Sequence, residues 1–285
     1  MPKAKKQEVA SVPEISPAIT KKIEEKQVQE RVAIGAHIVH ETIRREGEDE
    51  LKRTGSALAW SGLAAGLSMG FSLVAEALLA GYLPAAAWTR LLTKLGYSVG
   101  FLIVVLGRQQ LFTETTLTAV LPVLTQRSVP MAMRMMRLWG VVLLANLVGT
   151  YLFALCLARV QIFSPQVQQT LRAVSEDGLG AGFWVVVMRA IFAGWLIALM
   201  VWLLPGAESA RVSIIIILTY LIGLGGFNHV IAGSTKIFFL VASGAESWGN
   251  YLGRCLVPTL LGNIVGGVSL VTFLGHAQVV AGKEV

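Results

Sequence analysis

The sequence predicts an all-α polytopic membrane protein with six transmembrane helices, and two observations carry this prediction. Hydrophobic residues make up 54% of the 285 residues and charged residues only 14%, whereas a soluble domain carries about 25% charged residues. A bilayer core of about 30 Å requires roughly 20 consecutive apolar residues in one helix. Six segments meet this length: 57–80, 95–121, 134–158, 181–204, 212–243 and 252–275.

The second and fifth segments are too long for one simple span, and each has polar or glycine residues at its middle. The interruptions read LGRQQLFTET (106–115) and LGGFNHVIAGST (224–235). An irregular turn within hydrocarbon leaves backbone N–H and C=O groups unpaired, which is costly unless protein or water satisfies them. We therefore expect two broken helices that line a cavity or are enclosed by protein.

Two related motifs indicate an internal repeat. ANLVGT at 145–150 in the third segment resembles GNIVGG at 262–267 in the sixth. The same spacing, within one residue, relates the break at 111–113 to residues 229–231. Because three spans separate the two halves, the second half is expected to be inverted in the membrane. Paired interrupted helices in inverted halves are typical of a substrate path near the membrane midplane.

The charges divide the chain into a polar tail and a membrane body. Residues 1–53 hold 11 of the 24 lysines and arginines and 10 of the 17 acidic residues. We assign 1–54 to an N-terminal tail (disordered over 1–20, then helical), 55–278 to a six-helix transmembrane channel domain, and 279–285 to a C-terminal tail. The tail helix either stays solvated or packs beneath the pore and affects gating.

The distribution of basic residues predicts the orientation. An even number of spans places both termini on one side of the membrane. That side carries nine lysines and arginines near the spans, against five on the other, so the positive-inside rule makes it cytoplasmic. We expect a multi-pass protein of the cell (inner) membrane with both termini in the cytoplasm.

Several other classes of protein and site are not expected. The net charge of +7 comes mostly from the membrane body and no nucleic-acid-binding motif appears, so we expect no nucleic-acid partner. Cys156 and Cys255 lie in or beside apolar segments, so we predict neither a disulfide framework nor a metal site. No GxSxG elbow or catalytic triad occurs in the membrane segments, so neither an enzyme nor a cofactor is predicted.

Polar residues at the two breaks are the candidates for contact with a solute. The charge of a histidine such as His229 depends on its surroundings near neutral pH, and His229 can donate a hydrogen bond or a proton to an anion. Its structural alternative is a histidine that bonds only to backbone. Thr113 at the first break can donate to an anion, to His229, or only to its own backbone. Leu111 and Phe112 beside it would form an apolar constriction that excludes water.

Other polar residues have structural or electrostatic interpretations. Asn146 and Asn263, in the paired motifs, are expected to bond freed backbone groups near the breaks. Arg189, near the outer end of the fourth segment, either draws anions into a vestibule or snorkels to the interface. Four charged residues are expected to pair with another charge or to reach toward an opening or interface: Arg108, Glu114, Lys236, and Glu76, the last with Arg90 or Lys94 as its candidate partners.

Taken together, these motifs resemble the formate–nitrite transporter family over about residues 55–278. The matching pieces are LFTET at the first break, GFNHVIAGS at the second, RAIFAGWLIALMVW in the fourth segment and GNIVGG in the sixth. The long charged tail is similar to that of a little-characterised branch of the family. The resemblance implies an aquaporin-like fold of two inverted three-helix repeats with broken helices 2 and 5. It also implies a homopentamer with one pore per protomer.

The resemblance also implies a function and its residues. His229 matches a pore histidine, Thr113 matches a threonine on the first broken loop, and Asn228 joins them at the substrate. The implied constriction residues are Leu111, Phe112, Phe101 and Ile222. Family members pass small monovalent anions such as formate or nitrite across the bilayer, with no cofactor. We therefore predict a channel or transporter for such anions, with proton transfer through the histidine as one option.

Two departures from the family pattern leave the substrate open. Asn228 stands where many members have a glutamate before the pore histidine, and that glutamate would raise the basicity of the imidazole. Gly194 stands where many members have an asparagine, which would supply a donor near the pore. The alternative function is an aquaporin-like pore for small neutral solutes, although paired Asn-Pro-Ala motifs are absent from both breaks.

Overall fold

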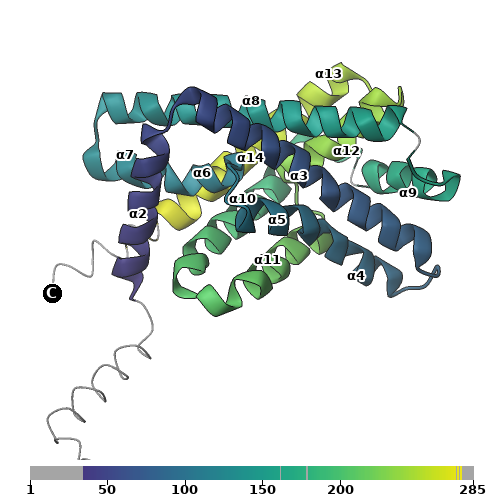
Figure 1. Cartoon of the computed structure of the whole chain (residues 1–285), viewed down its shortest axis with the longest axis horizontal. Helices are drawn as coiled ribbons and strands as arrows, with labels where there is room; N and C mark the ends of the chain where they lie inside the picture. The colour runs from purple at the N-terminus through teal and green to yellow at the C-terminus, as the bar shows by residue number, and fades with distance from the viewer. Residues whose placement is uncertain (1–34, 161, 178, 274, 276, 278–285) are drawn as a thin grey trace, which may run out of the picture. The chain divides into compact units, whose positions relative to one another are not determined.

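The computed structural model describes residues 35–160, 162–177, 179–273, 275 and 277. The predicted C-terminal tail, 279–285, and residues 1–34 lie outside this set. The described residues from Ala36 onward form one compact unit. Every regular element in the described part of the chain is a helix, as Figure 1 shows.

Six helical stretches are long and apolar enough to cross a membrane, which confirms the predicted all-α polytopic fold. Their bounds differ from the predicted segments mainly at the ends. Each contains at least 18 residues, the length at which a hydrophobic stretch becomes a candidate for a membrane span. The spans are Gly55–Tyr82, Thr89–Leu106, Val129–Arg159, Phe183–Gly206, Glu208–Gly225 and Trp248–Ser269.

Two helix pairs are packed closely through glycines. α3 (Gly55–Tyr82) lies along α8 (Val129–Arg159), and α10 (Phe183–Leu203) lies along α14 (Val257–Val265) (Figure 1). A Cβ on Gly66 of α3 would lie 2.2 Å from the backbone oxygen of Asn146, so no side chain fits there. In the α10–α14 pair, too, small residues let the two backbones approach too closely for a side chain.

The second and fifth predicted segments are broken, as expected, so the second and fifth spans end at the breaks, and the breaks are shorter than expected. α5 (Tyr97–Leu106) ends before residues 107–111, and α6 (Phe112–Thr118) and α7 (Val120–Gln126) follow. α11 (Arg211–Gly225) ends before residues 226–229, and α12 (Val230–Ala242) follows. The second span begins further out, with α4 (Thr89–Thr93) and the 3-10 helix η1 (Lys94–Gly96).

The loops and the last span contain further helices. α9 (Pro165–Glu176) was not predicted, although Ser164 and Pro165 form a helix start: the Ser164 hydroxyl accepts from the N–H of Val167. The last span alternates α-helical and π-helical turns. Its elements are α13 (Trp248–Asn250), η4 (Tyr251–Leu256), α14 and η5 (Gly266–Phe273). Short 3-10 turns η2 (Leu204–Gly206) and η3 (Glu208–Ala210) join the fourth and fifth spans.

The helix of the N-terminal tail packs against the membrane body. α2 (Ala36–Lys52) falls within the predicted helical stretch 21–54 and contacts α6, α7, α8 and α10. It buries Ile43 and Leu51 in these contacts. Gly47 is required for the fit, because a Cβ there would lie 1.9 Å from the backbone oxygen of Thr118. Of the two predicted states for this helix, the structure has the packed one.

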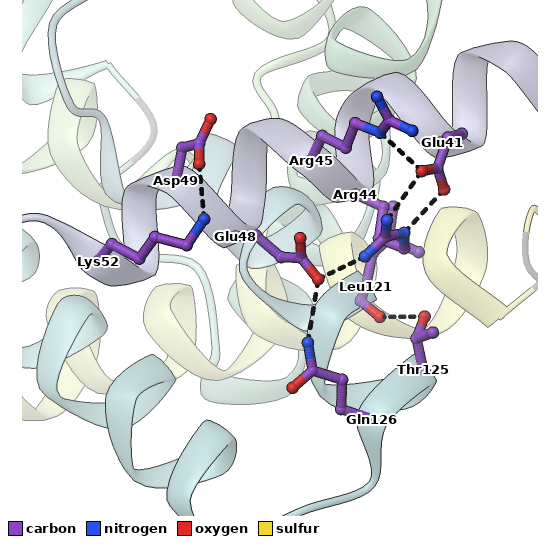
Figure 2. A network of polar contacts seen from close by, with 9 residues as sticks. All are labelled: Glu41, Arg44, Arg45, Glu48, Asp49, Lys52, Leu121, Thr125 and Gln126. Atoms are coloured by element: carbon purple, nitrogen blue, oxygen red, sulfur yellow. Dashed lines mark hydrogen bonds and ion pairs between the residues drawn. The ribbon is translucent and has the colours of Figure 1, made fainter.

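A polar network on α2 supports this packing (Figure 2). Arg44 forms ion pairs with Glu41 and Glu48 on the same helix, and Glu48 Oε1 accepts a hydrogen bond from Gln126 Nε2 at 3.0 Å. Hydrogen bonds from Arg44 and Arg45 lower the pKa of Glu41 to about 2. Because Gln126 is the last residue of α7, the network links the tail helix to the end of the second span.

Candidate functional site

His229 is the N-cap of α12, at the second break. Its backbone is extended, and its Nδ1 accepts a hydrogen bond from the N–H of Ala232 at 3.2 Å. Nδ1 therefore carries a lone pair, and the proton of the neutral ring lies on Nε2. The ring is buried, with an exposed fraction of 1%. The local structure thus fixes one neutral tautomer of the imidazole.

Thr113 on α6 meets this histidine from the other break. Its Oγ1 lies 2.7 Å from His229 Nε2, so the ring N–H donates to the hydroxyl and the hydroxyl proton remains free for another acceptor. The ring of Phe101 on α5 packs edge-on against the imidazole, with 5.0 Å between the centroids. Three of the predicted site residues are therefore in one buried cluster.

Two asparagines hold the breaks in matching ways. Asn146 Oδ1 accepts from the N–H of Phe112 at 2.9 Å, and its Nδ2 donates to the carbonyls of Gly62 and Gln110. Asn263 Oδ1 accepts from the N–H of Val230 at 2.8 Å, and its Nδ2 donates to the carbonyls of Ala190 and Asn228. Each asparagine thus satisfies backbone groups that a break takes out of the helical ladder.

The two helices that end at a break, α5 and α11, end in the same type of turn. The N–H of Gln109 bonds to the carbonyl of Val104, and the N–H of Phe227 bonds to the carbonyl of Ile222, each at 3.0 Å. The preceding residue is left-handed in both turns, with φ 49° at Arg108 and 62° at Gly226. This is the six-to-one bond of a Schellman-type helix end.

A cavity of about 570 Å³ borders the second break. Its walls come from the start of the second span, the loop after the third span, the second break and the start of the sixth span. His229, Asn228 and Ile222 lie among its lining residues. Five basic residues and two acidic ones also line it. The basic residues are Arg90, Lys94, Arg189, Lys236 and Arg254, and the acidic ones are Asp177 and Glu246.

The predicted constriction residues fall in two places. Ile222 lines the cavity, and Phe101 covers the imidazole. Leu111 and Phe112 are also buried but are not among the described residues that line the cavity, and the Phe112 ring packs against Trp139 with 5.9 Å between centroids. The structure therefore brings only two of the four residues to the cavity or the histidine.

A charge cluster on the cavity wall includes one predicted pair and one that was not predicted. Glu76 pairs with Lys94, one of its two candidate partners, at 2.8 Å. Its second partner is Lys236, at 2.9 Å, which is 160 positions further along the chain. Lys94 also donates a hydrogen bond to Asp177. Partial burial raises the pKa of the Asp177 carboxyl, but the interaction with Lys94 outweighs burial and holds this pKa below its usual range.

Gly194 has a packing role at the position where an asparagine was expected from the family pattern. A Cβ there would lie 2.4 Å from the backbone oxygen of Asn263. α10 therefore approaches α14 too closely for any side chain at this position. The second departure, Asn228, lines the cavity, and its side-chain oxygen has no hydrogen-bond partner among the described residues.

Comparison with known proteins identifies the family. The family model described as formate/nitrite transporter matches residues 37–277. The chain belongs to this family. Among curated formate/nitrite transporter relatives, the inner membrane protein YfdC of Escherichia coli (strain K12) is 41% identical over 251 residues, which cover 88% of this chain and 81% of the relative. The formate channel BtFdhC of Bacillus thuringiensis is 26% identical, over 82% of this chain and 92% of its own length.

Solved structures of the formate/nitrite transporter family share the fold. A pentameric formate channel with formate bound superposes with a TM-score of 0.66 at 23% identity, covering 80% of this chain and 98% of the channel. Such relatives are transporters or channels rather than enzymes. The chain is accordingly a multi-pass membrane protein of a transport family.

Proposed function

We propose that this protein is a channel or transporter for small monovalent anions of the size of formate or nitrite. The observation that carries the proposal is the cavity with an excess of basic residues that ends at the buried pair of Thr113 and His229. Arg189 on its wall adds to the attraction for anions. The formate channels among the relatives support the same class of substrate.

In the proposed mechanism the histidine stays neutral and acts as a hydrogen-bond donor. Protonation of Nδ1 would place its N–H against the N–H of Ala232, which now donates to that atom. A ring that keeps this cap has one N–H, on Nε2, and cannot give that proton away without becoming an imidazolate. The anion therefore receives hydrogen bonds from His229 Nε2 and the Thr113 hydroxyl as it passes. Proton transfer through the ring would require the cap to open first.

Asn228 adds a neutral amide to the same path. It precedes His229, lines the cavity, and leaves its side-chain oxygen unpaired among the described residues. An amide presents both an acceptor and N–H donors and carries no charge, so it can bond to an anion without repelling it. A carboxylate at this position would carry a negative charge beside the anion path.

The assembly and orientation follow the same proposal. We infer a homopentamer with one pore per protomer, since a solved relative of this fold is a pentameric channel. The matching hydrogen bonds of Asn146 and Asn263 support two inverted three-helix halves. With both termini in the cytoplasm and the protein in the inner membrane, the cavity faces outward, because it is lined by the starts of the second and sixth spans and by the loop after the third span.

Flux in liposomes tests the proposal. Purified protein should carry formate or nitrite at a rate above that of empty liposomes, and His229→Ala should alter this rate while leaving the oligomer intact by size-exclusion chromatography. A panel of small monocarboxylates, nitrite and hydrosulfide at two pH values identifies the substrate. Glycerol and water permeability measured by stopped flow covers the neutral-solute alternative. Water or glycerol flux without flux of any anion in the panel would overturn the anion proposal.

A further inference from the structure

Four charged side chains form a chain beside the cavity, and three of them, Lys94, Asp177 and Lys236, line it. Glu76 on α3 is fully buried, and its Oε2 accepts from Lys94 Nζ at 2.8 Å. Lys94 Nζ also donates to Asp177 Oδ2 at 2.9 Å. The other oxygen of Glu76, Oε1, lies 2.9 Å from Nζ of Lys236 on α12. The charges alternate, and the two lysines balance the two acids.

Lys236 stands on the same helix face as the pore histidine. It follows His229 by seven residues, which is about two turns or about 10 Å along the axis. Both residues line the cavity, and so does Gly233 between them. A Cβ on Gly233 would have no heavy atom within 4 Å, so this position borders open space. The face of α12 is therefore clear from the ammonium to the imidazole.

The ammonium group of Lys236 is held in place by its neighbours, but its N–H groups are not used in hydrogen bonds to described residues. The contact with Glu76 Oε1 is an ion pair, and Nζ makes no hydrogen bond among the described residues. The Tyr97 ring lies 5.7 Å from Nζ, in the range of a cation–π contact. The side chain has an exposed fraction of 13%. Its N–H groups are thus available to a ligand in the cavity.

We propose that Lys236 is a docking site for a small monovalent oxyanion, outward of the Thr113–His229 pair, and that Glu76 keeps this docking weak. The inference rests on the proposed function, because it assigns a further site on the same anion path. A site on a conduction path must bind well enough to be entered and weakly enough to be left. Glu76 shares its charge between two lysines, so it offsets only part of the charge of Lys236.

The test measures anion binding and flux separately. The binding of ¹³C-formate to the detergent-purified full chain is followed by NMR line broadening, and formate flux is followed in liposomes. The variants are Lys236→Met, Glu76→Gln and Gly233→Val. Lys52→Met is the matched control, since Lys52 is an exposed lysine on α2 that pairs with Asp49 and lies outside the cavity. Size-exclusion chromatography reports whether each variant assembles.

The proposal predicts a different signature for each variant. Lys236→Met should weaken formate binding and raise the half-saturating concentration for flux about tenfold, the effect of losing one charge-assisted hydrogen bond, with little change in the maximal rate. Glu76→Gln should tighten binding and lower the maximal rate. Gly233→Val, which adds bulk to open space, should reduce the maximal rate and keep binding at Lys236. Lys52→Met should match the wild type.

The outcomes separate this inference from the proposed function. Binding that is unchanged in Lys236→Met would overturn the docking site, whether or not the wild type carries formate. Binding that Lys236→Met weakens, in a protein with no flux for any anion, would support the site and count against the transport proposal. If Glu76→Gln fails to assemble, the double variant Lys236→Met/Glu76→Gln removes both charges, and it should bind formate as weakly as Lys236→Met.

Discussion

Asn146 and Asn263 make the same three hydrogen bonds in the two halves of the chain. Each accepts from the N–H of the first residue of a broken half-helix, Phe112 or Val230. Each also donates to the carbonyl two residues before that N–H and to a carbonyl on a neighbouring span. A single side-chain amide therefore compensates for the missing helical bonds at each break. This allows an irregular segment to persist in the membrane.

Replacement of Asn263 by Asp should destabilise the protein. The carboxylate would keep the acceptor for Val230 but lose the two donors, so the carbonyl of Asn228 at the break would lose its partner and the new charge would face two carbonyl oxygens. An unpaired buried group costs about 1–3 kcal/mol, and the unfolding temperature in detergent should fall accordingly. Asn250→Asp, at the exposed end of α13, is the control. Equal unfolding temperatures for the two variants would contradict this account of the breaks.

The hydroxyl of Thr113 should matter for flux more than its shape does. Thr113→Val removes the partner of His229 Nε2, which lies 2.7 Å away, and leaves a side chain of similar volume. We expect formate flux to fall about three- to tenfold, the range of one net hydrogen bond. Thr113→Ser keeps the hydroxyl and should retain most of the flux. The same rate for the valine and serine variants would remove Thr113 from the proposed path.

The sequence predicted the spans and both breaks, because apolar length and paired motifs are local signals. It also placed Thr113 and His229 at the two breaks, where the structure brings them together. It did not predict that Glu76 pairs with Lys236, since these residues lie on different helices that only the folded packing brings together. The positions of Leu111 and Phe112 also depend on packing: both residues are buried where α6 begins, and neither lines the cavity. α9 was missed because it is short and most of its residues are polar.

The left-handed residues of the two turns should respond oppositely to substitution. Arg108 has φ 49° and an exposed side chain, so Arg108→Gly relieves strain and should stabilise the protein by about 0.5–1 kcal/mol. Gly226 has φ 62°, so Gly226→Ala introduces the strain and should destabilise it by about 1–2 kcal/mol. Thermal unfolding in detergent measures both. A shift in the same direction for the two variants would show that the turns are not equivalent.

The packing of α2 should strengthen as the pH falls from about 8 to about 5. Burial raises the pKa of the Glu50 carboxyl, even though Thr118 Oγ1 and Gln110 Nε2 donate to it at 2.5 and 2.9 Å. A raised pKa means that the packed state binds a proton more tightly than the released one. The cost of burying the carboxylate is therefore present above the raised pKa and is relieved as the pH falls toward the ordinary glutamate value of about 4.3.

Hydrogen–deuterium exchange of the α2 amides, corrected for the intrinsic pH dependence, measures this effect. Exchange should be slower at pH 5 than at pH 8 in the wild type, and Glu50→Gln should remove the difference, because an amide imitates the protonated acid. Asp49→Asn, at an exposed position of the same helix, should leave it unchanged. Glu41 does not interfere, since its pKa is lowered to about 2 and its ion pairs are lost only at more acidic pH. A pH effect that persists in Glu50→Gln would assign the dependence to another group.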